Sequence, residues 1–428
     1  MLIEVICTGD EVLTGKIVNT NFSYIAQKLE DFGLAVRWGL TVGDDRADLL
    51  RAFLDAGGWA DAVIVNGGLG TTVDDLSQEV AAEAAGVKLV LNEDWLTRMK
   101  AYFEGRDRNM PENNVKQAML PEGAELIDNP VGTACGFALN IGKARFYFTP
   151  GVPRELRRML EREILPRMLE KQGAKNVIRL KRFHSFGLGE SHVDSLLSGI
   201  EQLVPDGSLK LGFRAHYPQL ETKLTVRGAS DAEVQAKLAP VEAEVHKRIG
   251  NFILAEDDET LEGVVLTLLA ERQASLAVVE GFSGGQLAAR LAPLPGSEGV
   301  FLRGIVVRRL AELYGALGLD GNAPSDEAAL TPEVAVAAAE AVRVQAGASH
   351  GLALLVALEN EQEPANIHST ICVAVSAGGE VASRRSRLIG NRDWVRLGAV
   401  EMGLDSLRRY LKGLPIREKI DFERAAPN

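Results

Sequence analysis

The chain has 428 residues, which is enough for two or three domains. It is 46% hydrophobic and 25% charged, and its mean hydropathy is near zero, as in an ordinary soluble globular protein. Its 47 lysines and arginines against 59 aspartates and glutamates leave a net charge of −12. This balance argues against a general nucleic-acid binder and against a membrane-surface protein.

The sequence also lacks the usual signals for export or membrane insertion. The N-terminal stretch MLIEVICTGDE carries an acidic fourth residue and no basic region, unlike a signal peptide. Apolar runs such as Leu352–Leu358 are far too short to span a bilayer. Cys7, Cys135 and Cys372 are isolated, with no C-x-x-C pair, and we expect Cys7 and Cys135 to pack in apolar surroundings. We therefore expect a cytoplasmic protein.

The first part of the chain alternates strand and helix patterns. Short apolar runs predict buried strands at Leu2–Cys7, Ala35–Val42 and Ala62–Val65. Amphipathic spacing predicts helices between them, one ending near Leu29 and one over Ala47–Ala56. This alternation predicts an α/β fold with a doubly wound, mostly parallel sheet that binds ligands at the carboxyl ends of its strands. Three loops fall on that edge: Thr8–Glu11, Gly43–Asp45 and Gly67–Asp75.

The loop after the third strand reads Asn66-Gly-Gly-Leu-Gly-Thr-Thr-Val-Asp-Asp75 and leads into a helix. Glycines let the backbone approach a ligand closely, and the free N–H groups at a helix start favour phosphate. Asp74 and Asp75 would be costly beside a phosphate unless a cation bridged them, so they are candidate ligands for a Mg²⁺-type ion. Alternatively, the glycines only form a tight turn, and Thr72 or Asp74 only caps the helix.

The remaining sequence predicts the end of this domain and two further units. The first domain should close with strands at Ala124–Ile127, Gly136–Leu139 and Arg145–Thr149 and a helix at Arg154–Met168. A small α+β unit should follow, with strands at Ile178–Phe183, Leu209–Phe213 and Glu221–Arg227 and helices at Glu190–Leu197 and Asp231–Ile249. After the acidic stretch Glu256–Glu259, an α/β unit is expected, with helices at Thr260–Arg272, Gln286–Leu291, Pro332–Ala346 and Arg392–Lys412 and strands at Ser275–Val279, Gly351–Leu358 and Ser369–Val375.

Five motifs occur in order along the first domain: Thr8–Asn21, Asn66–Asp75, Asn114–Gln117, Asn129–Ala134 and Pro150–Pro153. Together they closely resemble the CinA (competence/damage-inducible protein A) family, and the resemblance covers essentially the whole chain. It implies a first domain at 1–171 with the fold of the MoaB/MogA molybdopterin-binding proteins, a small KH-type connector at 172–256 and a nicotinamide mononucleotide deamidase-like domain at 257–428. It also implies ADP-ribose pyrophosphatase activity, a metal-assisted cleavage of the diphosphate, in the first domain.

The motifs and the residue chemistry together give an expected site. Asp74, Asp75 and Lys116 are the expected catalytic residues, and Glu11 and Asp75 are the expected metal ligands, with Asp44 a weaker carboxylate candidate. The metal is expected to be Mg²⁺, Mn²⁺ or Co²⁺. Where the family usually has proline, Thr71 frees a backbone N–H and adds a hydroxyl. The expected substrate-binding residues are Thr8, Gly9, Asn19, Asn21, Gly67, Gly68, Gly70, Thr71, Asn114, Gly132 and Thr133.

The C-terminal unit departs from the family in the residues expected to react. Gly281 stands where the family has its nucleophilic serine, and Ser283 replaces a threonine two residues further on. Arg308 fills the position of a tyrosine, and Ala357–Gln362 replaces the phosphate-holding loop and adds two carboxylates. We therefore expect a domain that keeps its fold and lacks the deamidase activity.

The sequence also bears on the partners of the protein. The middle unit lacks a clear Gly-x-x-Gly loop with basic neighbours, so no RNA binding is inferred and no nucleic-acid or membrane partner is expected.

The leading interpretation is hydrolysis of ADP-ribose or a related dinucleotide by the N-terminal domain. One alternative is a nucleotide- or molybdopterin-binding module without turnover. The other is a scaffold that acts by forming a homo-oligomer, and a dimer is expected.

Overall fold

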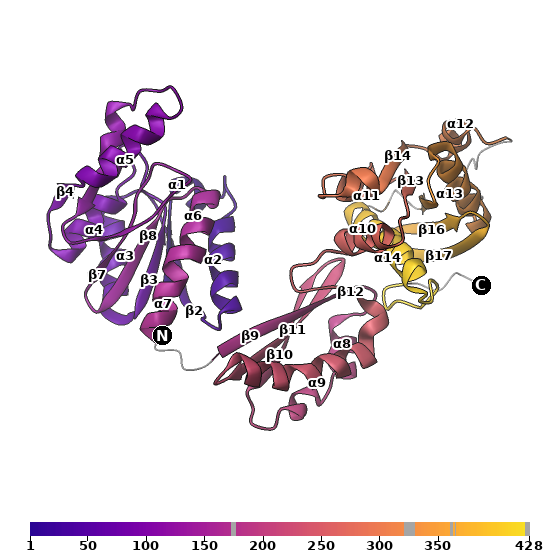
Figure 1. Ribbon diagram of the computed structural model, residues 1–428, viewed down its shortest axis with the longest axis horizontal. Helices are drawn as coiled ribbons and strands as arrows, with labels where there is room; N and C mark the ends of the chain where they lie inside the picture. Colours follow the sequence, from indigo (N-terminus) through magenta and orange to yellow (C-terminus); the bar gives the residue numbers. More distant parts are fainter. Residues whose placement is uncertain (173–176, 321–329, 360–362, 364, 424–428) are drawn as a thin grey trace. The chain divides into compact units, whose positions relative to one another are not determined.

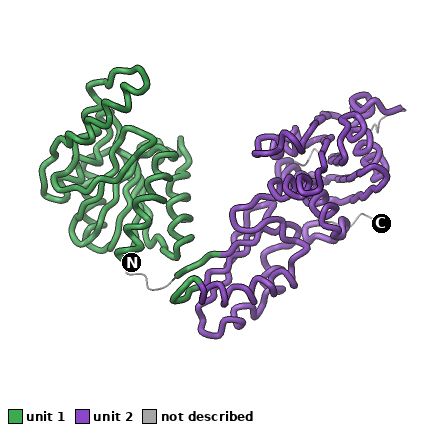
Figure 2. The backbone as a smooth tube through the Cα atoms, viewed as in Figure 1, with its two compact units in different colours: residues 1–180, 227–231 green, residues 181–226, 232–428 purple. Residues whose placement is uncertain are grey.

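The computed structural model describes the chain except for residues 173–176, 321–329, 360–362, 364 and 424–428. Figure 2 shows its two compact units, residues 1–180 with 227–231, and residues 181–226 with 232–428. A six-stranded sheet lies in the first unit, and a four-stranded and a five-stranded sheet lie mostly in the second. The expected division into three independent domains stays a prediction.

The N-terminal sheet is doubly wound and mostly parallel, and the predicted α/β class is confirmed (Figure 1). Its strand order is β2-β1-β3-β8-β7-β6, in which β2, β1, β3 and β8 are parallel and β7 and β6 are antiparallel to their neighbours. The strands are β1 (Ile3–Thr8), β2 (Val36–Val42), β3 (Ala62–Asn66), β6 (Glu125–Ile127), β7 (Gly136–Ile141) and β8 (Ala144–Thr149).

Both faces of this sheet are covered because its central strands are apolar on both sides. Alternate residues of a strand point to opposite faces, so Val63 and Val65 enter one core while Ala62 and Ile64 enter the other. The first core is closed by α3 (Arg46–Trp59), α4 (Ser77–Ala85) and α5 (Glu93–Glu104). The second core is closed by α2 (Thr20–Asp31), α6 (Pro153–Met159) and α7 (Leu165–Gln172).

Several elements of the first unit differ from the sequence prediction. The turn expected at Thr8–Glu11 leads into a short helix, α1 (Asp10–Leu13). The helix expected at Arg154–Met168 is interrupted by a π-helical turn at Leu160–Ile164. Between β4 (Leu89–Leu91) and β6, the chain forms α5, a 3-10 helix at Glu112–Ala118 and strand β5 (Met119–Pro121), which pairs with β4, and none of the short elements was predicted. The short strands and the 3-10 helix carry too few residues for a periodic apolar pattern.

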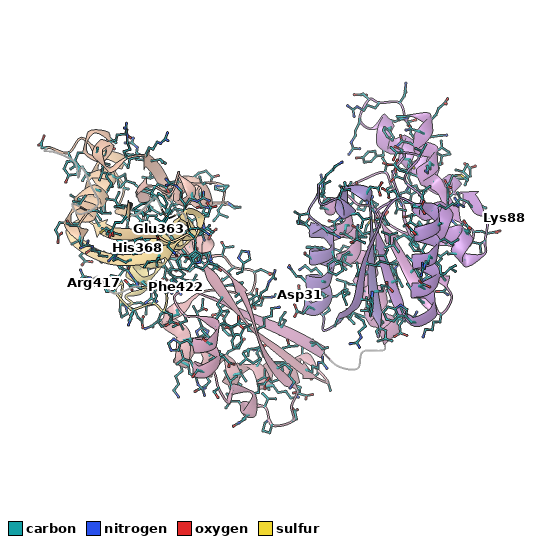
Figure 3. The ribbon with its side chains drawn as sticks, turned by 180° about the vertical axis from the view of Figure 1, so that it is seen from behind. Asp31, Lys88, Glu363, His368, Arg417 and Phe422 are labelled. Carbon is teal, nitrogen blue, oxygen red and sulfur yellow. The ribbon has the colours of Figure 1, made fainter. Side chains whose placement is uncertain are left out.

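The second unit begins with a small antiparallel sheet in the order β10-β11-β9-β12. Its elements are β9 (Val177–Ser185), α8 (Glu190–Leu196), β10 (Leu209–His216), β11 (Gln219–Gly228), α9 (Asp231–Ile249) and β12 (Ile253–Glu256). The ring of Phe422, labelled in Figure 3, packs edge-on against Phe186 with centroids 5.3 Å apart. A residue near the described end of the chain therefore packs beside the end of β9.

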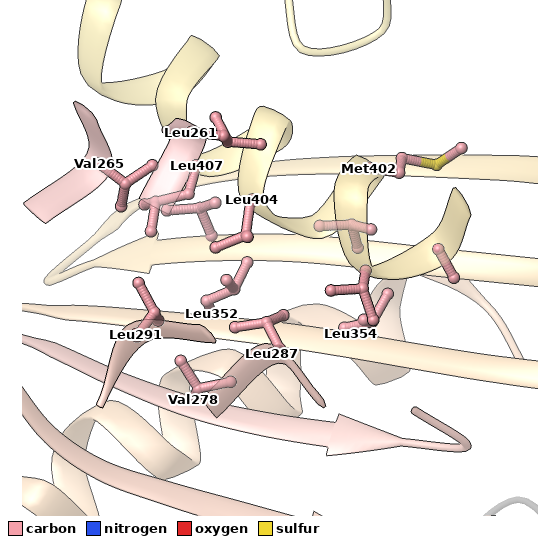
Figure 4. Packing of buried hydrophobic residues seen from close by; sticks show 14 of the residues in the cluster. Leu261, Val265, Val278, Leu287, Leu291, Leu352, Leu354, Met402, Leu404 and Leu407 are labelled. Carbon is pink, nitrogen blue, oxygen red and sulfur yellow. The ribbon is translucent and has the colours of Figure 1, made fainter. Parts of the chain in front are cut away.

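The C-terminal sheet is mixed and has the order β14-β13-β15-β16-β17. Leu352 and Leu354 face a core closed by α10 and α14 (Figure 4), while Ala353 and Leu355 face a core closed by α13. The elements are α10 (Leu261–Glu271), β13 (Leu276–Gly281), α11 (Gln286–Leu291), β14 (Phe301–Val307), α12 (Leu313–Leu317), α13 (Pro332–Ala346), β15 (His350–Glu359), β16 (Ile367–Ala377), β17 (Glu380–Gly390) and α14 (Arg392–Lys412).

Three strands of the second unit were not predicted. β12 ends in the stretch read as an acidic link, while β14 and β17 are edge strands. Edge strands bury little and therefore carry a weak apolar pattern, as the exposure of Leu302 and Val306 in β14 illustrates. All three cysteines are buried and unpaired, including the two expected to pack in apolar surroundings. In the part of the chain that the structure describes, no helix is both long enough and apolar enough to cross a membrane.

The contact of α13 with β15 depends on Gly351 and gives a stability prediction. A Cβ atom at Gly351 would lie 1.9 Å from the Ala339 carbonyl oxygen and 2.8 Å from the Arg343 Cβ. Gly351→Ala should therefore lower the free energy of unfolding of the C-terminal domain by about 2–3 kcal/mol, because helix and strand must move apart. The measurement is urea unfolding followed by circular dichroism.

Gly315→Ala is the matched control, since a Cβ there meets no atom within 4 Å and the residue lies inside α12. Alanine favours helical backbone, so this variant should be neutral or slightly more stable. An unchanged urea midpoint for Gly351→Ala would contradict the packing described here.

Candidate functional site

A cavity of about 520 Å³ lies at the carboxyl ends of the parallel strands of the first unit. The register places Thr8, Asn66 and Thr149, the last residues of β1, β3 and β8, side by side on one edge of the sheet. The chain order reverses between β1 and β3, which is where doubly wound sheets open a crevice for ligands. The expected residues on its wall are Thr8, Gly9, Glu11, Gly67, Gly68, Gly70, Thr71, Asp74, Asp75, Asn114 and Thr133.

The floor of the cavity is built by a close backbone approach at Gly67 and Gly68. Their φ angles are 114° and 70°, in the region that favours glycine. A Cβ atom at Gly67 would lie 2.4 Å from the Thr8 Oγ1, and one at Gly68 would lie 2.3 Å from the Ser77 Oγ. The Ser77 hydroxyl in turn donates to the Gly67 carbonyl at 2.9 Å. The loop is therefore fixed before any ligand binds.

The Thr8 hydroxyl indicates most directly that the floor of the cavity can bind a ligand. Thr8 is 8% exposed and lines the cavity, yet its Oγ1 has no hydrogen-bond partner among the residues that the structure describes. A buried hydroxyl without a partner costs free energy, so such groups usually bind water or a ligand. A ligand oxygen on the glycine loop would provide that partner.

The rest of the loop is closed by Asp75 and held by Lys116. The Asp75 Oδ2 accepts hydrogen bonds from the Thr72 backbone N–H at 2.8 Å and from the Thr72 hydroxyl at 2.5 Å. The Lys116 Nζ donates to the Thr72 carbonyl at 2.7 Å and lies 3.9 Å from Glu79. The alternative that Thr72 or Asp74 only caps the helix is wrong, because α4 begins after Leu76 without a side-chain cap. The loop is thus stabilised internally.

Five carboxylates line the cavity: Glu11, Asp44, Asp74, Asp75 and Glu155. In the described part of the chain, no lysine, arginine or histidine lines it. Burial raises the pKa of Asp44, and the negative charges of Asp10, Glu11 and Asp74 raise it further. Thr72 and, more weakly, the Lys116 ammonium lower the pKa of Asp74, which is exposed. The cavity therefore concentrates negative charge, which favours binding of a cation.

Four expected site residues do not line the cavity. Asn19 caps α2 by accepting a hydrogen bond from the Phe22 backbone N–H at 2.9 Å. Asn21 donates to the Asn66 Oδ1 at 2.9 Å and to the Gly151 carbonyl at 2.7 Å. Lys116 and Gly132 are likewise outside the wall. Asn21 and Lys116 support the loops that form the cavity, although nothing in the contacts shows them facing a ligand.

Other wall residues were missed, although most lie within or beside the quoted motifs. The Gln117 Nε2 donates to the Leu69 carbonyl at 3.1 Å, and its Oε1 accepts from the Asn114 side chain at 3.2 Å. Asp44, a weaker carboxylate candidate in the sequence, does line the cavity. Glu155 lies two residues after the Pro150–Pro153 motif. The full missed set is Leu69, Gln117, Ala134, Pro150, Gly151, Val152 and Glu155. The signal for Glu155 was its place in the first turn of a helix that follows a strand.

The oxygen atoms in the cavity can supply some, but not all, of the ligands of a hard divalent cation. Carboxylate and carbonyl oxygens are the ligands of Mg²⁺, which commonly uses only one or two protein carboxylates and completes its shell with water and phosphate oxygens. Within the described residues, no group of three or more histidines, cysteines, aspartates and glutamates is arranged to hold a metal by itself. The residues therefore fit a cation that is shared with a phosphate ligand, and Glu11 and Asp75 are on the wall where it would bind.

The residues of the C-terminal domain that depart from the family pattern occupy structural positions. Ser283 is 1% exposed, and its hydroxyl donates to the Glu280 carboxylate at 2.5 Å. That carboxylate also accepts the backbone N–H groups of Leu287 and Ala288 at the start of α11. A Cβ at Gly281 would meet no atom closer than 3.6 Å. Packing therefore does not explain why a serine is missing there, and Ser283 is too deeply buried to contact a substrate.

The other two departures lie at the same end of the sheet. Arg308 follows β14 and is exposed. Ala357 and Glu359 belong to β15, and the Glu359 carboxylate accepts a hydrogen bond from Arg387 at 2.9 Å. The rest of the expected loop, residues 360–362, lies outside the described residues. The described part of this loop therefore presents a carboxylate that is already paired with an arginine.

Comparisons with known proteins match the three parts of the chain separately and as a whole. A family described as a probable molybdopterin binding domain matches residues 4–170, the damage-inducible protein CinA KH domain matches 180–255, and the CinA C-terminal domain matches 258–411. A CinA-like protein of Shewanella sediminis is 37% identical, with 96% of each chain covered. A CinA-like protein of Frankia casuarinae is 37% identical over 100% of each chain. The crystal structure of a CinA protein of unknown function from Thermoplasma acidophilum is 36% identical, covering 40% of this chain and 96% of that one with a TM-score of 0.35.

The charge crowding at Asp44 gives a prediction about pH. Because its pKa is raised in the folded protein, folding favours the protonated form, and that stability is lost as the pH rises through the folded-state pKa. Asp44→Asn should therefore melt at a higher temperature than the parent at neutral pH without divalent cations. The difference should vanish below pH 3.8, the ordinary aspartate pKa. Thermal unfolding measured across pH tests this.

The matched control is Asp48→Asn, an exposed aspartate in the first turn of α3, which should not raise the melting temperature. Millimolar Mg²⁺ should stabilise the parent more than Asp44→Asn, since a ligand that binds the folded state raises its stability. A lower melting temperature for Asp44→Asn at neutral pH would show that the carboxylate is not under repulsion.

Proposed function

The chain belongs to the family of CinA-like proteins, and from that premise we propose that its N-terminal domain hydrolyses the pyrophosphate of ADP-ribose or a related dinucleotide with the help of a divalent cation. The observation that carries the proposal is the cavity at the carboxyl ends of β1, β3 and β8. It combines a rigid glycine loop, a buried hydroxyl with no hydrogen-bond partner among the described residues, and carboxylates from several loops.

The charges of the cavity support the metal requirement. A diphosphate is an anion, and five carboxylates without a basic side chain on the described wall would repel it. A divalent cation shared between the carboxylates and the phosphate oxygens converts this repulsion into attraction. Lys116 acts on the carboxylate of Asp74, but it does not line the cavity, and its ammonium donates to the Thr72 carbonyl. We therefore assign Lys116 to positioning the loop.

The protein groups have separate tasks in the proposed reaction. Backbone N–H groups of Gly67, Gly68 and Gly70 and the Thr8 hydroxyl would bind phosphate oxygens. The cation, held by Glu11 and Asp75, would polarise the phosphorus and lower the pKa of a water molecule. Asp74 would orient the attacking water. A new bond from the water oxygen to phosphorus replaces the bond to the bridging oxygen, which leaves on the second phosphate, so ADP-ribose gives AMP and ribose 5-phosphate.

A binding module without turnover is the second candidate, and the family description of residues 4–170 as a probable molybdopterin binding domain favours it. The same rigid loop would bind a pterin phosphate as well as a nucleotide phosphate. A panel of ADP-ribose and other nucleoside diphosphate compounds, each with Mg²⁺, Mn²⁺ or Co²⁺, separates the two candidates. Release of AMP supports hydrolysis, and metal-dependent binding without product supports the binding module.

The C-terminal domain gives the next prediction, because its reactive positions are replaced or buried. The protein should not deamidate nicotinamide mononucleotide, since Gly281 has no nucleophile and Ser283 is inaccessible. Purified protein incubated with this substrate should release no more ammonia than a heat-denatured sample. Ammonia release above that control would mean that another residue of this domain attacks the amide.

Asp75 gives the prediction that tests the proposed reaction. Asp75→Asn keeps the size of the side chain and an oxygen that can accept from Thr72, but it removes a charge that would hold the cation. Turnover of ADP-ribose should fall by on the order of 10² or more, by analogy with removal of one electrostatic stabiliser. Release of AMP as a function of metal concentration is the measurement.

Two controls separate the charge from the loop contact. Thr72→Val removes the hydroxyl that donates to Asp75 but keeps the carboxylate, so its effect should be smaller. Asp61→Asn, at the opposite end of β3, should retain the parent rate because this side chain, which accepts from the Leu2 backbone N–H, does not line the cavity. Parent-like turnover and metal dependence in Asp75→Asn would rule out this carboxylate as a metal ligand.

A further inference from the structure

Glu155 lines the cavity but has no task in the proposed hydrolysis. It lies in the first turn of α6, directly after β8, on the same wall as the glycine loop. Its Oε2 accepts a hydrogen bond from the Asn129 amide at 2.6 Å, and Asn129 is itself 3% exposed. The carboxylate packs on Gly132, where a Cβ would lie 2.2 Å from its carboxyl carbon. The Glu155 side chain is thus held in one orientation by a buried amide.

The carboxylate of Glu155 is separated from Asp44 and from the carboxylates that act on Asp44. The pKa of Asp44 is raised by burial and by the negative charges of Asp10, Glu11 and Asp74. The pKa of Glu155 depends on burial, Asn129 and Arg154, and on none of those carboxylates. The strand order agrees, because β8 lies beyond β3 on the side away from β1 and β2. Neighbouring strands are about 4.8 Å apart, so the ends of β2 and β8 are separated by roughly 14 Å. Gly67 and Gly68, directly after β3, lie between the ends of β2 and β8.

A single oriented carboxylate suits a different part of a ligand from a group of carboxylates. An ionised carboxylate only accepts hydrogen bonds, with about four acceptor positions, and Asn129 occupies one of them. Alone, it supplies too few ligands for a dication, but it can accept from two neighbouring hydroxyls. Acidic side chains recognise ribose in this way at other nucleotide sites built on doubly wound sheets.

We propose that Glu155 accepts hydrogen bonds from the vicinal hydroxyls of a ribose whose phosphate lies on the Gly67–Gly70 loop, and that it thereby selects ligands that carry an intact ribose. The inference rests on the proposed function, because it takes the ligand to be a nucleotide-type diphosphate. It places the cation near Glu11 and Asp75, the phosphates over Gly67–Gly70 and the sugar beside β8. Glu155 is then a specificity-determining residue that takes no part in bond cleavage.

The test compares ligands that differ only in the hydroxyls. The probes are AMP with 2′,3′-dideoxy-AMP, and ribose 5-phosphate with 2-deoxyribose 5-phosphate, titrated calorimetrically into the full chain with Mg²⁺. The parent protein should prefer the hydroxylated member of at least one pair by about tenfold, close to the lower limit for a single hydrogen bond to a charged group. Glu155→Gln should lose that preference and still bind the deoxy probe with parental affinity.

Glu170→Gln is the matched control, since this exposed glutamate on α7 does not line the cavity. It should keep the preference, and both variants should melt at the parent temperature. The inference is overturned if Glu155→Gln keeps the parental preference, if it weakens the hydroxylated and deoxy probes equally, or if the parent shows no preference at all. A preference lost in Glu155→Gln supports the inference even if the parent never releases AMP. The absence of AMP release would contradict only the proposed hydrolysis.

Discussion

The close approach of β1 and β3 at their carboxyl ends is the constraint on which the N-terminal site depends. Gly67 lies so near Thr8 that a single Cβ atom would clash with the threonine hydroxyl, and Gly68 is equally close to Ser77. With both positions free of side chains, the chain turns sharply after β3 and leaves its backbone bare at the crevice between the two strands. The loop that follows is held by Thr72, Asp75 and Lys116, so the site is rigid before a ligand arrives.

The charge of the cavity follows from which loops meet on this edge. The loops after β1, β2, β3 and β8 each bring at least one carboxylate, and no basic side chain of the described residues lines the cavity. Such a surface repels a free diphosphate and attracts a cation. The C-terminal domain keeps its packing but not its reactive residues. Its buried leucines and alanines form two cores, while Gly281 lacks a reactive group. Core packing and surface chemistry depend on different residues, so one can persist when the other has changed.

The sequence was informative where a pattern is long or its chemistry is local. The buried runs of β1, β3 and β15 and the helices α9, α13 and α14 were predicted within a residue or two because burial imposes their period. The glycine loop was found because positive φ angles and a close approach require glycine. The edge strands β14 and β17 were missed because one exposed side and few partners leave little pattern.

The tasks of individual site residues were harder to predict than the site itself. Asn21 and Lys116 belong to quoted motifs, yet their amide and ammonium groups bind loop atoms, and Asp75 holds Thr72 as well as lining the cavity. Sequence motifs do not distinguish residues that contact a ligand from residues that support the loop. Glu155 was missed because a glutamate in the first turn of a helix usually needs no explanation beyond the helix dipole, and only the fold brings it to the cavity.

Calorimetric titration of ADP-ribose into the full chain, once with excess chelator and once with Mg²⁺, Mn²⁺ or Co²⁺, tests the central claim most directly. The claim is that the acidic cavity accepts a diphosphate only together with a divalent cation. We predict no measurable binding with chelator and clear binding with at least one metal, weakened by Asp75→Asn. Equally tight binding with chelator and with metal would contradict it, because the carboxylates would then have no part in holding the ligand.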